Sequence, residues 1–118
     1  MNPHSAAEQE YVARVLSAYR QTPGTTGIVR PADRRLAGQL QQRGVPLSVI
    51  ENALLLAVAR RWFRDPTASP LGTVRSLAYF GPVIEEVLNT EISPTYFQYL
   101  RRKLERMNIP LFPPFLAS

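Results

Sequence analysis

Apolar residues recur at intervals of three and four along most of this chain, the spacing that places them on one face of an α-helix. No segment alternates with period two, as a half-buried β-strand would. The helical spacing covers residues 5–21, 31–43, 46–64, 74–88 and 93–108, with turn-forming glycines and prolines between the segments. We therefore expect an all-α fold, a compact bundle of four to five helices.

The middle segment, residues 46–64, predicts the centre of this bundle. It contains the stretch ALLLAVARRWFR, in which residues 53–59 are apolar without a break. A helix that is apolar on every side is enclosed by other helices. Seven residues are too few to cross a bilayer, which takes about 20. Trp62 and Phe63 are expected to pack inward or beneath the following loop.

Proline positions define the two later helices. In residues 74–88 the helical spacing continues through Pro82, which predicts either one helix kinked there or two short helices in line. In residues 93–108, Ser93 can cap the helix and Pro94 suits its first position. The apolar stripe expected to face inward on this last helix consists of Tyr96, Phe97, Leu100, Leu104 and Met107.

The C-terminal residues predict an extended tail. Pro113 and Pro114 exclude a helix there, so we divide the chain into one helical domain, residues 1–108, and a proline-rich tail, residues 109–118. The tail is rich in apolar side chains, namely Ile109, Leu111, Phe112, Phe115 and Leu116. It is expected to lie over a groove, either on its own domain or on a partner.

Charge narrows the choice of partners. The formal net charge is +5, and 13 of the 14 basic residues are arginine. Residues 30–65 hold seven arginines against three carboxylates, and residues 101–118 hold four basic residues against one. Arginine suits phosphate recognition, so this excess favours an anionic partner. A genome rich in G and C would also enrich arginine throughout, and the composition alone does not separate the two explanations.

Candidate chemistry is sparse. The chain has no cysteine and one histidine, His4, so a zinc site of the usual ligands and a Cys–His pair are excluded. The histidine lies at the N-terminus, where we expect no Ser-His-Asp triad. Glu85 and Glu86 are neighbours on a helix and diverge, which favours a solvated acidic patch. We expect no catalysis, no cofactor and no metal. A cysteine-free chain without a signal-peptide pattern fits the cytoplasm, and no membrane association is expected.

The basic clusters are the best functional candidates. They comprise Arg60, Arg61 and Arg64 at the end of the central helix, Tyr99, Arg101, Arg102, Lys103 and Arg106 on the last helix, and Arg34, Arg35 and Arg43 as an extension. Arginine beside an exposed aromatic ring suits phosphate neutralisation with base stacking. The alternatives are simple complementation of a helix dipole by the first group and an ordinary solvated face for the second.

Residues 44–88 resemble the helical module of DnaD-like primosomal and phage replication proteins. Gly44, Val49, Ile50 and Ala53 match a glycine-led helix of that module, and Tyr79, Val83 and Val87 match the helix that follows its polar loop. The tryptophan that closes the family signature is absent, since Val87 stands in its place, and Pro82 interrupts the helix. The resemblance implies DNA binding and protein contact in replication or in a mobile element, without catalysis.

Two functional hypotheses follow. The first is a small basic accessory protein that binds nucleic acid through phosphates, with little sequence preference. The second is a protein–protein adaptor, a homo-oligomer or a helical subunit of a larger nucleoprotein complex. The second would dock through the hydrophobic tail and the acidic patch, which are represented by Phe112, Phe115, Leu116, Glu85 and Glu86.

Overall fold

A computed structural model of the chain describes residues 5–113. The elements are α1 (Ala6–Gln21), α2 (Pro31–Gln42), α3 (Leu47–Trp62), a 3-10 helix η1 (Leu77–Phe80), α4 (Gly81–Asn89) and α5 (Pro94–Arg106). Among these residues there is no β-strand beyond an isolated bridge, so the all-α prediction is confirmed. No helix within residues 5–113 has the length and apolar character needed to cross a membrane.

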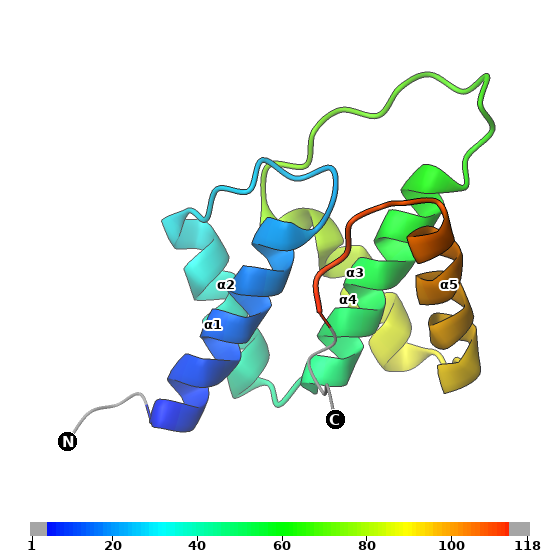
Figure 1. Ribbon diagram of the computed structural model, residues 1–118. Helices are drawn as coiled ribbons and strands as arrows, with labels where there is room; N and C mark the ends of the chain where they lie inside the picture. The colour runs from blue at the N-terminus through cyan, green and yellow to red at the C-terminus, as the bar shows by residue number, and fades with distance from the viewer. Residues whose placement is uncertain (1–4, 114–118) are drawn as a thin grey trace.

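Helix α3 is the central element of the bundle. Every residue from 53 to 59 is at most 5% exposed. Helices α1, α4 and α5 all pack against α3, and α2 packs on α1 (Figure 1). The uninterrupted apolar run allows this arrangement because each side of α3 meets a different neighbour.

The segment predicted as a helix from residue 74 begins later. Val74 instead lies in extended chain: its N–H donates to Gly24 O at 2.7 Å, and its carbonyl accepts from Thr26 N at 2.9 Å. This bridge joins the long loop after α3 to the loop between α1 and α2, seen side by side in Figure 1. Pro82 then occupies the first turn of α4, where its missing N–H costs no hydrogen bond. The structure therefore has two short helices in succession, the second of the two predicted alternatives.

A buried carboxylate fixes the start of α2 against η1. Asp33 is 2% exposed. Its Oδ2 accepts from Arg30 N at 2.8 Å and its Oδ1 accepts from Leu77 N at 2.9 Å. These bonds satisfy one amide at the N-terminus of α2 and one at the start of η1, so a single side chain connects segments 44 positions apart.

The tail packs on its own domain as far as the structure describes it. Ile109 is 7% exposed and Phe112 is 1% exposed, and both belong to the hydrophobic core. Asn108 has φ of 60°, which ends α5 and turns the chain back toward the bundle (Figure 1). Phe112 is thus a core residue and not the partner-docking residue that we predicted. Phe115 and Leu116 lie outside the described residues.

Candidate nucleic-acid interface

Two of the predicted phosphate-binding arginines are paired with the predicted acidic patch. Arg43 Nη1 donates to Glu85 Oε1 at 2.7 Å, and Arg60 Nη1 donates to Glu86 Oε1 at 2.8 Å. Each pair has a second hydrogen bond, so both are bidentate. The hydrogen bond from Arg43 lowers the pKa of Glu85, and that from Arg60 lowers the pKa of Glu86. The adjacent carboxylates diverge as predicted, but each has an arginine as its partner.

Arg101 connects α5 to α3 and to the tail. Its Nη2 donates to Glu51 Oε1 at 3.3 Å, and its Nη1 donates to Phe112 O at 3.0 Å. Its guanidinium also lies 5.3 Å from the centroid of the Phe112 ring. Both charged side chains of the ion pair are only 16% exposed. Arg101 therefore has a structural role and is poorly placed to meet an external phosphate.

Arg61 and Arg64 hold the loop that follows α3. Arg61 Nη2 donates to Gly72 O at 2.8 Å and Nη1 donates to the Tyr79 hydroxyl at 3.4 Å. The guanidinium packs directly on Gly24, where a Cβ would stand 3.2 Å from Arg61 Nε. Arg64 Nη1 donates to Ser69 O at 2.9 Å. Both arginines remain charged, but their side chains are held in place by hydrogen bonds to carbonyl oxygens of the loop.

The outer face of α5 collects the remaining candidates. We name it the α5 platform: Tyr96, Tyr99, Arg102, Lys103 and Arg106. The two tyrosine rings are stacked, with centroids 6.4 Å apart, and are 45% and 46% exposed. The Lys103 ammonium lies 4.2 Å from the centroid of the Phe63 ring and 5.9 Å from that of Tyr99. Within residues 5–113, none of the three cations of the platform is in salt-bridge contact with a carboxylate.

Tyr96 belongs to this platform although we predicted that it faces inward. The buried stripe of α5 consists of Phe97, Leu100 and Leu104, whose spacing of three and four residues covers the contact with α3. Tyr96 and Met107 fall beside that stripe and are 45% and 43% exposed. Helix α5 packs on one side only, so it buries a stripe of three apolar residues and leaves the neighbouring Tyr96 and Met107 partly exposed.

The end of α3 is also more open than predicted. Phe63 is half-buried against the core, whereas Trp62 is 38% exposed. Phe63 therefore packs inward, the first of the two predicted alternatives, whereas Trp62 is partly open to solvent and lines a pocket with Pro66 and Leu71 of the following loop. Phe63 extends the α5 platform, because its ring carries the Lys103 ammonium.

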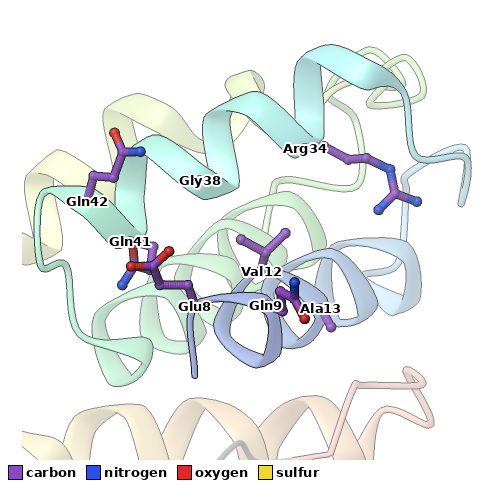
Figure 2. Close-up of a pocket in the computed structure, with 8 residues that line it drawn as sticks. All are labelled: Glu8, Gln9, Val12, Ala13, Arg34, Gly38, Gln41 and Gln42. Carbon is purple, nitrogen blue, oxygen red and sulfur yellow. The ribbon is translucent and has the colours of Figure 1, made fainter. Parts of the chain in front are cut away.

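Arg34 and Arg35 lie on α2, on the opposite side of α3 from α5 (Figure 1). Arg34 stands at one end of a pocket of about 340 Å³ between α1 and α2, with Glu8 and Gln42 toward the other end (Figure 2). Gly38 leaves part of the wall of this pocket without a side chain. The structure thus does not join these two arginines to the α5 platform, and the Glu8 carboxylate opposes a phosphate in the same pocket.

No protein-family profile, curated protein or solved structure matches this chain. Within residues 5–113 no cluster of three histidine or acidic side chains could hold a metal ion. The α5 platform offers cationic and aromatic surface to a ligand.

Proposed function

We propose that the protein is a non-catalytic accessory protein that binds nucleic acid through the α5 platform. The observation that carries the proposal is the coincidence, on one helix face, of two exposed tyrosines with three cations that have no carboxylate partner among the described residues. Phosphate oxygens are the natural partners of such cations, and nucleobases are the natural partners of exposed aromatic rings.

The contacts available to this face predict weak sequence preference. Arg102, Lys103 and Arg106 are suited to phosphates, which are the same in every sequence. From Tyr96 to Arg106 the helix rises about 15 Å, enough for a few nucleotides of a strand. Affinity should therefore depend on charge and on strand length more than on base identity.

Two observations weaken the adaptor hypothesis. The acidic patch is engaged by Arg43 and Arg60, and Phe112 is buried in the domain itself. A role in replication or in a mobile element is implied by the DnaD-like resemblance of residues 44–88 and forms part of the proposal on that ground alone.

Salt dependence tests the proposal. Three phosphate contacts predict that log K falls against log salt with a slope of about −2 for a single strand and about −2.7 for a duplex. Between 50 and 200 mM salt this is a loss of roughly 20-fold to 40-fold in affinity. Fluorescence anisotropy with a labelled oligonucleotide measures both quantities.

A matched pair of double variants tests whether nucleic acid binds to α5 or to α2. Arg102→Glu with Arg106→Glu should abolish binding, whereas Arg34→Glu with Arg35→Glu, the same change of charge on α2, should retain most of it. An affinity that does not change with salt, or an equal loss from the two double variants, would contradict the proposal.

A further inference from the structure

A groove opens beside the α5 platform, between α4 and α5. Both helices pack against α3, and the groove has a volume of about 480 Å³. Its apolar lining includes Leu56 and Ala59 of α3 and Leu100 of α5, all at most 5% exposed. The Arg60–Glu86 ion pair also lines it, with side chains 52% and 40% exposed. The groove is thus apolar at its base and polar at its rim.

Aromatic residues make the groove continuous with the platform. Tyr96 and Phe63 line the groove. The Tyr96 ring also stacks on Tyr99, and the Phe63 ring also carries the Lys103 ammonium. A ligand that enters the groove therefore lies next to Lys103, whose ammonium has no carboxylate partner within residues 5–113.

We propose that this groove receives an unpaired nucleobase, so that the protein prefers single-stranded nucleic acid to duplex. The inference rests on the proposed function and names the substrate class of the same surface. A base has flat apolar faces, which suit Tyr96 and the apolar base of the groove, and a polar edge, which suits the donors and acceptors of Arg60 and Glu86. In a duplex the bases are stacked and paired, and flipping one outward costs a few kcal/mol.

Charge complementarity favours a nucleobase over an apolar side chain of a partner protein. An apolar peptide residue would fill the base of the groove but would supply no anion to Lys103, Arg102 and Arg106, which have no carboxylate partner within residues 5–113. A nucleotide places its base in the groove and its phosphate on Lys103, Arg102 or Arg106 in a single strand. A single strand thus contacts both the groove and the cations of the α5 platform.

The test compares three probes with the full chain: oligothymidylate of about ten nucleotides, an abasic phosphodiester of the same length and charge, and a duplex of that length. Wild type should bind oligothymidylate about 5-fold to 150-fold more tightly than the abasic chain, the range expected for one stacked base. It should also prefer oligothymidylate to the duplex. Equal affinity for oligothymidylate and the abasic chain, or a preference for duplex, overturns the inference and leaves the groove to a protein partner.

Tyr96→Leu separates the base contact from the phosphate contacts. It should reduce the affinity for oligothymidylate much more than the affinity for the abasic chain, so that the preference for oligothymidylate falls. Tyr79→Leu, a change at an equally exposed tyrosine on η1, is the matched control and should keep the preference. If Tyr96→Leu keeps the full preference, the groove does not receive the base.

Photo-crosslinking of a bromouracil-containing strand to wild type gives a second readout that does not depend on a variant. Crosslinks should map to residues 56–63 or 92–100, and crosslinks confined to other segments overturn the inference. If none of the three probes binds at low salt, the proposed function itself fails, whereas loss of base preference alone leaves it intact.

Discussion

Replacing Asp33 by alanine tests how the two halves of the bundle are joined. The Asp33 carboxylate is 2% exposed and accepts hydrogen bonds from two backbone amides, those of Arg30 and Leu77. Leu77 is fully buried, so water cannot readily replace the lost acceptor at its N–H. Arg30 is exposed at the start of α2, and its amide can turn to solvent at a lower cost.

The expected loss of stability follows from the environments of these two amides. An orphaned buried N–H costs about 1–3 kcal/mol. Loss of a carboxylate cap at a helix N-terminus costs about 0.5–2 kcal/mol. We therefore expect Asp33→Ala to reduce the free energy of unfolding by about 1.5–5 kcal/mol, a large part of the roughly 5–15 kcal/mol typical of a domain.

Urea unfolding followed by circular dichroism measures this change. The midpoint should fall while the slope m stays constant, since the surface exposed on unfolding is the same. Asp33→Asn retains one carbonyl acceptor and should lose less than Asp33→Ala. A loss below about 1 kcal/mol for Asp33→Ala would refute the assignment of Asp33 as a buried connection between α2 and η1.

Three further predictions concern the tail, a half-buried tyrosine and a surface ion pair. Phe112→Ala should cost about 3–5 kcal/mol in urea unfolding because the ring is in the core, and a loss near zero would place the tail elsewhere. Burial raises the pKa of Tyr11 from 10.0 to about 12, so its contribution to stability is complete below pH 10 and is lost as pH rises toward 12. Tyr11→Phe should make the measured loss of stability over that interval smaller, and an unchanged loss would contradict the assignment. Arg43→Gln should return the pKa of Glu85 toward its ordinary value in an NMR titration, and a Glu85 pKa that stays as low would show that Arg43 is not its main partner.

The central helix could be predicted from sequence because its signal is local. Seven consecutive apolar residues, followed by arginines, specify an enclosed helix that reaches the surface, and α3 has this form. The start of the next helix could not be predicted in the same way. The extended conformation of Val74 is fixed by hydrogen bonds to Gly24 and Thr26, whose separation along the chain leaves no periodic pattern.

The residues of the candidate site could be predicted only in part, because their charges are local in the sequence and their partners are not. Arginine clusters are visible in the sequence, but their partners are distant: Arg43 and Glu85 are 42 positions apart, and Arg101 and its carboxylate partner are 50 apart. Net charge by segment therefore overestimates the number of cations available to a ligand. Tyr96 was missed because it adjoins the buried stripe, although Phe97, Leu100 and Leu104 alone supply a sufficient packing face.

The most direct test of the account is a map of where nucleic acid touches the protein. Amide chemical shifts of the full chain, recorded during titration with oligothymidylate at low salt, should change for α5 and for the end of α3 around Phe63. They should stay unchanged for α2, including Arg34 and Arg35. Changes confined to α2, or no changes at any ratio of oligonucleotide to protein, would contradict the claim that the α5 platform is a nucleic-acid interface.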